Sequence, residues 1–351
     1  MHTKTITELN GFRAFAIALV VFFHYNIYIK FIPGFDSLII KGGVIGVALF
    51  FSLSGFLMTY PLLIRASENK SFMSVKDFYK ARLFRIIPLY LFTMLLFFCF
   101  RSHLHGNARL PASFTFVGFL QALFFFNDSL INLNAVVWTL KIELIFYLIF
   151  PLLGYLVFIL YKKKNLVLLG AILLLLLVIP LLIRYSGKIE PKSFYCNFDS
   201  LVMGIIVAII YSYKNEIPTP KSSFFWPFML GIGLAIMIYS LRISDAMEKT
   251  LVTISIGIMV TSSLFWDFVY YKKILSSKIL GYIALISYSL YLWHYNIYFN
   301  VAQPLAKLLP YTSKAIYNGY VILIALCVTL VLSIFTYYAI EKPFLKLKKW
   351  I

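Results

Sequence analysis

Long apolar runs recur along almost the whole chain, with only short polar connections between them. Ten runs approach the length of about 20 residues that an α-helix needs to cross a bilayer. They lie near residues 12–30, 44–63, 86–101, 138–159, 166–183, 197–213, 224–241, 250–270, 280–300 and 317–338. Lipid offers exposed backbone groups no hydrogen-bond partner, and the runs are too long for barrel strands, so each run predicts a helix. The expected fold class is an all-α, polytopic membrane helix bundle with about ten transmembrane helices.

The composition argues against a soluble enzyme. Of the 351 residues, 62% are hydrophobic and 13% are charged, whereas a soluble domain is nearer half apolar and about a quarter charged. Because ten spans leave no length for a sizeable second domain, residues 1–351 are expected to form a single integral-membrane domain. Cys99, Cys196 and Cys327 form no disulfide framework or zinc pattern, and no metal site is predicted.

The net charge of +19 comes from 32 Lys and Arg against 13 Asp and Glu. On a soluble chain this excess would suggest nucleic acid, but between apolar runs it fits membrane topology and anionic lipid headgroups. If the short segment 114–126 does not cross and the N-terminus is cytoplasmic, 20 basic residues lie inside and 12 outside; if it crosses, the division is 16 to 16. The positive-inside rule therefore favours cytoplasmic N- and C-termini, with 114–126 re-entrant or interfacial in an outer cap of residues 102–137.

Ionisable side chains inside the predicted spans are costly, so each is a candidate for function. Arg13 and His24 are eleven residues apart, a spacing that returns an α-helix to nearly the same face after a rise of about 16 Å. Arg13 is expected at the cytoplasmic mouth and His24 in the outer half, where one stripe could bind an anion and carry out proton chemistry. The alternative is an interfacial anchor and a histidine that is hydrogen-bonded within the bundle.

A carboxylate and a second histidine lie inside two later spans. Glu143 belongs to a polar stripe that recurs every four residues, and it either takes part in function or pairs with a cation. Ser287, Tyr291 and His294 follow i, i+4, i+7 spacing in an otherwise apolar helix. His294 could orient a substrate hydroxyl or support His24, and taken singly such a histidine is more often a satisfied structural group.

Two further clusters have both a binding and a structural interpretation. Arg82 and Arg85 close the most basic inner loop at i, i+3 spacing, which suits bidentate phosphate binding; topology and lipid headgroups are the alternative. The stretch from Gly42 to Gly55 is rich in small residues. Such residues let a ligand chain reach the backbone or let helices approach closely, and taken alone the stretch is more typical of helix packing.

Seven sequence blocks follow one another from the first span to the last. They are Asn10-Gly-Phe-Arg13 through His24, the glycine-rich stretch from Gly42, Phe50-Phe-Ser52-Leu-Ser54-Gly55-Phe56, Arg82-x-x-Arg85-Ile-Ile-Pro88-Leu-Tyr90, Trp138-Thr-Leu-x-x-Glu143-x-x-Phe-Tyr147, Ser287-Tyr-Ser-Leu-Tyr291-Leu-Trp-His294 and Glu341-Lys-Pro343-Phe344. In kind and order these blocks resemble the acyltransferase-3 family of bacterial integral-membrane acyltransferases. The resemblance covers essentially the whole chain.

The resemblance implies a membrane O-acyltransferase, most often an O-acetyltransferase, in the bacterial cytoplasmic membrane. Such an enzyme would take an acyl group from cytosolic acyl-CoA, a co-substrate rather than a tightly bound cofactor. The acceptor would be a hydroxyl of a cell-envelope or exported carbohydrate or glycolipid. Membrane lipids and polysaccharide-assembly proteins are further expected partners, and nucleic acid is not. The chain resembles the stand-alone form without an extra extracytoplasmic domain, so a second catalytic step would need a separate protein.

The resemblance also implies a role for each polar side chain. Arg13 and His24 form the catalytic signature, with His24 as general base or acyl carrier and Glu143 orienting it. The resemblance implies that the donor phosphates bind to Arg13, Arg82 and Arg85. The pantetheine arm of the donor would lie along Gly46, Ser52, Ser54 and Gly55. The acceptor would bind beside Trp138, Tyr291 and His294.

Some positions depart from the common family pattern, and two other protein classes compete with it. Leu144 and Ile145 stand where Glu and Gln often follow the family's carboxylate, and Asn296 replaces a common proline. The substrate of a particular relative therefore cannot be assigned to this chain.

A transporter or flippase for a sugar-containing or anionic solute is one rival interpretation, but the chain lacks the matching halves typical of transporters. A scaffold for polysaccharide assembly is the other, and it would tolerate loss of the catalytic pair.

Overall fold

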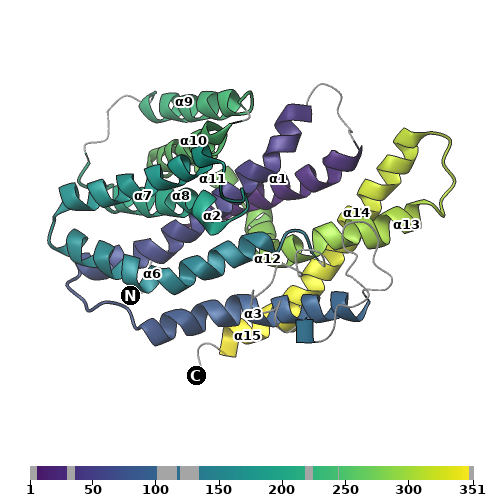
Figure 1. Ribbon diagram of the computed structural model, residues 1–351, viewed down its shortest axis with the longest axis horizontal. Helices are drawn as coiled ribbons and strands as arrows, with labels where there is room; N and C mark the ends of the chain where they lie inside the picture. Colours follow the sequence, from purple (N-terminus) through teal and green to yellow (C-terminus); the bar gives the residue numbers. More distant parts are fainter. Residues whose placement is uncertain are drawn as a thin grey trace. The chain divides into compact units, whose positions relative to one another are not determined.

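The computed structural model describes residues 6–29, 36–100, 117–118, 134–217, 224–243 and 245–347, the side chains of residues 27–40 excepted. Within these ranges the chain is helical and contains no β-strand, which confirms the all-α prediction. Each of the ten apolar runs falls on a helix (Figure 1): α1 (Leu9–Ile29), α2 (Asp36–Ser67), α3 (Val75–Cys99), α6 (Trp138–Lys162), α7 (Leu166–Ser186), α8 (Phe198–Ser212), α9 (Phe225–Ser240), α10 (Ala246–Phe265), α12 (Lys278–Ile297) and α14 (Lys314–Thr336). The predicted segment 114–126 lies outside the described ranges, apart from residues 117–118.

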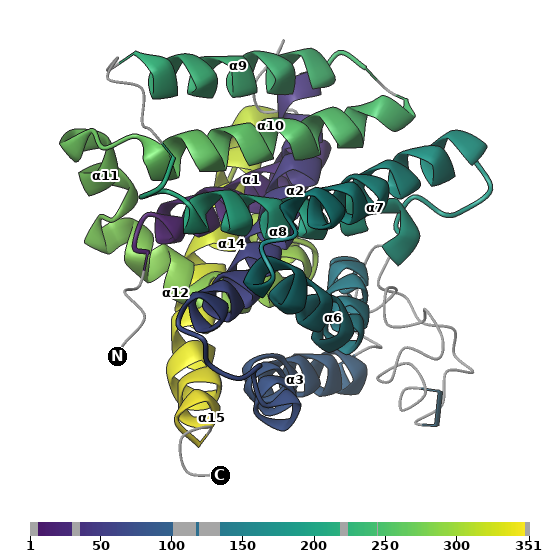
Figure 2. The same cartoon turned by 90° about the vertical axis from the view of Figure 1, so that its left-hand side faces the viewer.

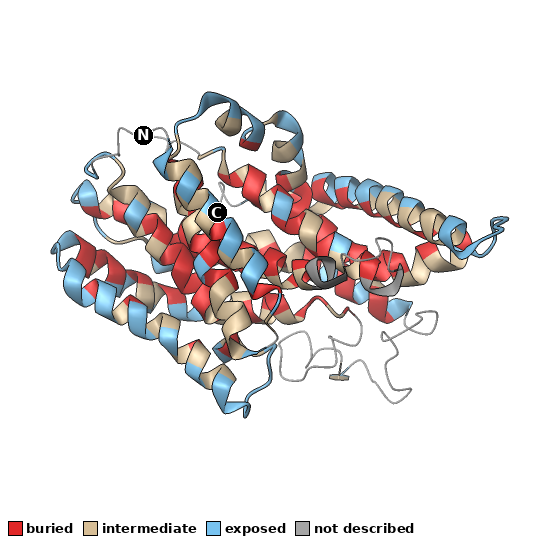
Figure 3. Cartoon of the chain, turned by 90° about the horizontal axis from the view of Figure 1, so that it is seen from above, coloured by how far each residue is buried: buried red, intermediate tan, exposed pale blue. Residues whose placement is uncertain are grey.

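The helices have the apolar exterior of an integral membrane protein. In the described part of the chain, seven helical segments are long and apolar enough to cross a membrane, and α8 and α9 are shorter apolar helices. α1 adds 21 residues, about the length of a span. Along many helices, exposed faces alternate with buried ones (Figure 3), and the exposed positions include large apolar side chains such as Leu148 and Leu182, which are 69% and 61% exposed. Apolar surface of this extent marks contact with lipid rather than water.

The helices pack into two compact units. The first comprises residues 1–19, 41–74 and 142–284, and the second comprises residues 20–40, 75–141 and 285–351. In the first unit α9 lies along α10, and α8 packs against both α7 and α10 (Figures 1 and 2). The short helix α11 (Val269–Leu275) also belongs to the first unit. That residues 1–351 act as a single domain stays a prediction.

Two glycines of the first unit bring α2 and α8 into backbone contact. A Cβ atom on Gly55 would lie 2.0 Å from the carbonyl oxygen of Leu201, and one on Gly204 would lie 1.9 Å from that of Ser52. Ser52 Oγ also donates a hydrogen bond to the carbonyl oxygen of Ser200 at 2.9 Å. Of the two interpretations that the sequence offered for the small residues, these contacts are those of helix packing.

We expect Gly204→Ala to destabilise the protein by about 1–3 kcal/mol or more, because a methyl group would force the two backbones apart. The measurement is the thermal unfolding midpoint of the purified protein in detergent. Gly231→Ala on α9 is the matched control, since a Cβ atom there meets nothing within 4 Å. Equal unfolding midpoints for the two variants would contradict a tight α2–α8 crossing.

In the second unit, α12 and α14 each run into a π-helical turn. The turn η4 (Tyr298–Ala302) leads into α13 (Gln303–Ala306), and η5 (Tyr337–Glu341) leads into α15 (Lys342–Leu347). Both η5 and α15 pack against α3, where the ring centroid of Phe344 lies 6.3 Å from that of Phe84. The last sequence block, Glu341 to Phe344, therefore supports the helix that carries Arg82 and Arg85.

Candidate active site

Helix α1 carries the two residues of the expected catalytic signature. It is continuous from Leu9 to Ile29, so Arg13 and His24 lie on one face of the same helix, as their spacing predicts. Both side chains are half-buried. Arg13 belongs to the first unit and His24 to the second, and each is described below with the residues of its own unit.

His24 lies beside the second histidine that the sequence singled out. Its Nδ1 is 3.2 Å from Nε2 of His294 and 2.9 Å from the carbonyl oxygen of Val20. The two ring centroids are 4.9 Å apart. His294 is fully buried, and its own Nδ1 lies 3.1 Å from the carbonyl oxygen of Leu290. Of the roles open to His294, support of His24 is the one that this contact fits.

One assignment of the ring protons satisfies all three contacts of the two histidines. A carbonyl oxygen only accepts hydrogen bonds, so the Nδ1 atoms that face Val20 and Leu290 each carry a hydrogen. Because a neutral imidazole has a single N–H, Nε2 of His294 is then an acceptor. His24 shares its Nδ1–H between the Val20 carbonyl oxygen and His294 Nε2. This tautomer puts the lone pair of neutral His24 on Nε2, the nitrogen that a general base would use.

Hydrogen bonds connect α12 to the start of α6 in the second unit. The hydroxyl of Tyr291 donates to the carbonyl oxygen of Val136 at 2.9 Å and lies 2.6 Å from Thr139 Oγ1. Asn134, which is fully buried, donates from Nδ2 to the carbonyl oxygen of Leu292 at 2.9 Å. These bonds hold α12, with Tyr291 and His294, against the segment that begins α6 at Trp138.

Asn134, whose side chain bonds to α12, is a buried residue near the candidate site that sequence analysis missed. It precedes the block that starts at Trp138 and has no counterpart of its own in a motif. The signal that could have identified it is weak: a single amide just before an apolar run, whose burial needs a partner. Trp138 itself is half-buried at the first position of α6.

Glu143 lies in the first unit and is held by two hydroxyl groups. Its Oε1 accepts a hydrogen bond from Ser54 Oγ of α2 at 2.9 Å and another from the hydroxyl of Tyr147, one turn further along α6. The carboxylate is half-buried. The structure thus brings Glu143 and Ser54 together, and that Glu143 orients His24 stays a prediction.

The expected donor residues fall in both units. Gly46, Ser52 and Gly55 are buried on α2, and Ser52 and Gly55 make the α2–α8 contacts described above. Arg82 and Arg85 are half-buried on α3 in the second unit. The guanidinium carbon of Arg82 lies 5.6 Å from the ring centroid of Phe78, a cation–π distance. That these residues hold a donor stays a prediction.

The described residues include no group of three or more His, Cys, Asp or Glu side chains that could hold a metal ion.

Comparison with known proteins places these residues in a family context. A family model described as an acyltransferase domain matches residues 6–338. The peptidoglycan O-acetyltransferase OatA of Listeria monocytogenes is 28% identical over 326 residues, which cover 84% of this chain and 49% of that protein. The O-acetyltransferase OatA of Staphylococcus aureus is 28% identical over 374 residues, which cover 98% of this chain and 58% of that protein.

The chain spans about half the length of these curated relatives, and no solved structure matches it. The family match nevertheless covers nearly the whole chain, and six of the seven sequence blocks lie within residues 6–338. Together with the helical membrane fold, a match of this extent shows that the protein belongs to the acyltransferase-3 family.

Proposed function

We propose that the protein is a membrane O-acetyltransferase that moves an acetyl group from acyl-CoA to a hydroxyl of a cell-envelope carbohydrate or glycolipid. The observation that carries the proposal is the pair of histidines, whose contacts are all satisfied when His24 donates from Nδ1 and keeps its lone pair on Nε2. The relatives support the reaction class, since both are named as O-acetyltransferases and one as acting on peptidoglycan. Peptidoglycan is accordingly the first acceptor to test.

In the proposed reaction His24 is the general base. Its Nε2 takes the proton of an acceptor hydroxyl while the hydroxyl oxygen attacks the acyl carbonyl carbon. The carbon–sulfur bond then breaks, and the departing thiolate of coenzyme A receives the proton. In the variant mechanism Nε2 attacks the acyl carbonyl carbon and expels the coenzyme A thiolate; the acceptor hydroxyl then attacks the acylated ring, Nε2 leaves, and the hydroxyl proton passes to the thiolate. Both routes use the same nitrogen, and in both the Nδ1–H stabilises the positive ring through His294 and the Val20 carbonyl.

The donor is proposed to bind from the cytosol, with both chain termini on that side of the bacterial cytoplasmic membrane. Arg82, Arg85 and Arg13 would hold its phosphates, because guanidinium groups bind phosphate in bidentate fashion. The pantetheine arm would follow α2 past Gly46 and Ser54, since Ser52 and Gly55 of that helix lie against α8. Glu143, held by Ser54, would add negative charge to the site and stabilise the cation that forms during transfer.

We propose that the acceptor binds beside Trp138, Tyr291 and His294. Tyr291 and His294 share a face of α12, and Trp138 begins the helix to which α12 is bonded. Aromatic rings with a polar edge suit a carbohydrate, which presents both apolar faces and hydroxyl groups. Proteins of polysaccharide assembly would deliver or receive this acceptor.

The test of the function uses the full chain in proteoliposomes, with labelled acetyl-CoA supplied outside and peptidoglycan fragments as the acceptor. Covalent label on the fragments supports the proposal. Accumulation of unaltered solute without acetylation would contradict it and favour a transporter. Mass spectrometry of envelope glycans from cells with and without the protein would identify the natural acceptor by the mass of one acetyl group.

A second test concerns the donor. We expect Arg82→Glu with Arg85→Glu to raise the KM for acetyl-CoA at least about tenfold, because each charge-assisted hydrogen bond contributes about 1.5–3 kcal/mol. The KM for the acceptor should stay unchanged. Lys76→Glu with Lys80→Glu, on the same helix, is the control with the same change in net charge. A rise in the acceptor KM alone would show that Arg82 and Arg85 bind the acceptor and not the donor.

A further inference from the structure

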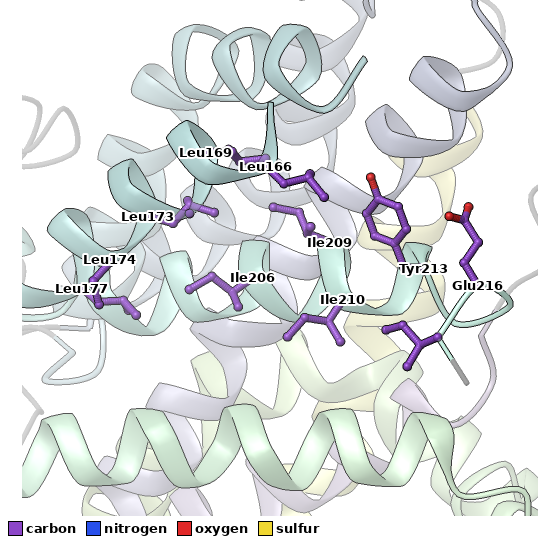
Figure 4. Close-up of a pocket in the computed structure, with 12 residues that line it drawn as sticks. Leu166, Leu169, Leu173, Leu174, Leu177, Ile206, Ile209, Ile210, Tyr213 and Glu216 are labelled. Atoms are coloured by element: carbon purple, nitrogen blue, oxygen red, sulfur yellow. The ribbon is translucent and has the colours of Figure 1, made fainter. Parts of the chain in front are cut away.

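The first unit contains an apolar groove that the acyl-transfer site does not use. It has a volume of about 580 Å³ and lies between α7 and α8, within the range of about 300–1,000 Å³ that is usual for ligand pockets. Aliphatic side chains of the two helices face each other along it, with Tyr213 and Glu216 at one end and Leu174 and Leu177 at the other (Figure 4). The walls along the helices are aliphatic, which suits a flexible hydrocarbon chain.

A glycine makes the groove hollow. Gly170 lines it on α7, and a Cβ atom at this position would meet nothing within 4 Å. Only 17% of the apolar window of α7 is buried, so the helix presents most of its surface outward. Unlike Gly55 and Gly204, which permit helix contact, Gly170 leaves open space beside its helix.

The length of the groove matches one leaflet of a bilayer. From Leu166 to Leu177 the α7 wall rises about 17 Å, and the hydrocarbon of one leaflet is about 15 Å thick. The end at Tyr213 and Glu216 therefore corresponds to the headgroup level, and the end at Leu177 to the middle of the bilayer. This match favours a single acyl chain that enters from one leaflet.

Basic side chains gather at the headgroup end. Three exposed lysines, Lys162 to Lys164, lie at the end of α6 and in the turn to α7, and only Asn165 separates them from the groove residue Leu166. The ring of Tyr161, next to this turn, lies 5.4 Å from that of Tyr213 in the groove. The three lysines outnumber Glu216, the carboxylate among the residues that line the groove. A phosphate headgroup would thus meet an excess of positive charge.

The turn that carries the lysines is well defined. Lys164 adopts a left-handed backbone conformation with φ of 55°, which ends α6. Asn165 then caps α7 by accepting a hydrogen bond from the Leu168 amide at 3.2 Å. The spacing between the lysines and the start of the groove is therefore fixed by helix capping.

We propose that this groove binds an anionic phospholipid, with one acyl chain along α7 and α8 and the phosphate on the Lys162–Lys164 turn. A neutral lipid would use the apolar walls but not the lysines. A second copy of this chain would need a broad contact area rather than a narrow groove with a charged end. The proposal is independent of the acyl-transfer reaction.

Native mass spectrometry of the full chain in detergent tests the proposal, with phosphatidylglycerol and phosphatidylcholine of the same chain length as probes. Gly170→Leu fills the groove, and Gly231→Leu is the matched control, because both glycines are exposed in apolar helices of the same unit with open space beside them. We expect wild type and Gly231→Leu to retain phosphatidylglycerol, and Gly170→Leu to lose about tenfold in affinity. Replacing all three lysines by Gln should abolish the preference for phosphatidylglycerol.

Two results would overturn the proposal. Equal lipid binding by the two leucine variants would show that the groove is not the site. Equal binding of phosphatidylglycerol and phosphatidylcholine by the wild type would show that the site does not recognise an anionic headgroup. A dimer that is lost only in Gly170→Leu would assign the groove to a protein contact and likewise overturn it. Matching circular dichroism spectra and unfolding midpoints for the two leucine variants confirm that the fold is retained.

Discussion

Replacing His24 by alanine is expected to lower acetyl transfer by about 10²–10⁴-fold, the contribution typical of a positioned general base, or to abolish it if the ring carries the acyl group. The ring is the group that the proposed mechanism places against the acceptor hydroxyl, and no other nitrogen base on α1 stands beside it. Initial rates of acetyl transfer in proteoliposomes, at saturating donor and acceptor, provide the measurement. Expression and membrane insertion should be unchanged, because alanine favours the helix.

The matched control for His24→Ala is Phe22→Ala. Phe22 lies on the same helix but is 63% exposed, so its loss removes a large ring without touching the histidine pair. It should keep near-normal activity. If His24→Ala also kept near-normal activity, the mechanism would be wrong, and His24 would be a structural residue of the bundle.

The second large effect is expected at His294, which acts through His24 and is therefore a positioning residue. His294→Phe keeps a ring of similar size but removes the acceptor for the His24 Nδ1–H. A hydrogen bond to a charged group contributes about 1.5–3 kcal/mol, so kcat should fall about 10–100-fold. The KM for the donor should stay nearly constant, because the proposed donor residues do not include His294 and its contact with His24 matters most when the ring becomes positive.

A conservative variant separates this role from packing. In His294→Gln the side-chain amide oxygen can accept the hydrogen bond from His24, so part of the lost kcat should return. Equal losses in His294→Phe and His294→Gln, with lowered unfolding midpoints in both, would indicate that His294 only fills space. A lower kcat for His294→Phe at an unchanged midpoint supports the positioning role.

The helices could be predicted from the sequence because lipid requires each span to satisfy its own backbone hydrogen bonds. Each span therefore appears in the sequence as a long apolar run, and the distribution of basic residues between the runs predicts the orientation of the chain in the membrane. The shared face of Arg13 and His24 was predictable for a similar reason, since helical periodicity is a local property. These features depend only on residues that are near in sequence.

The contacts of the candidate site depend instead on how distant helices pack. His24 and His294 are separated by 270 positions, and nothing in the sequence around either residue predicts that the two rings lie within hydrogen-bond distance. The sequence likewise left two roles for Gly55 and Ser52, ligand binding and helix packing, and their contacts with α8 come from a helix that is distant in sequence. Asn134 was missed because its hydrogen-bond partner is the backbone carbonyl oxygen of Leu292. Every residue has such a carbonyl group, so the sequence of α12 does not mark this position as a partner.

The two π-helical turns have a consequence for the phase of the helices that follow them. A π-turn accommodates one more residue than an α-helical turn, so every residue after it is rotated by about 100° from its place on an uninterrupted α-helix. At η5 this rotation decides which side chains of Lys342–Leu347 face α3, and Phe344 faces Phe84 in the rotated frame. A change in chain length of one residue can thus be absorbed inside a membrane helix, where it resets the contact face instead of lengthening a loop.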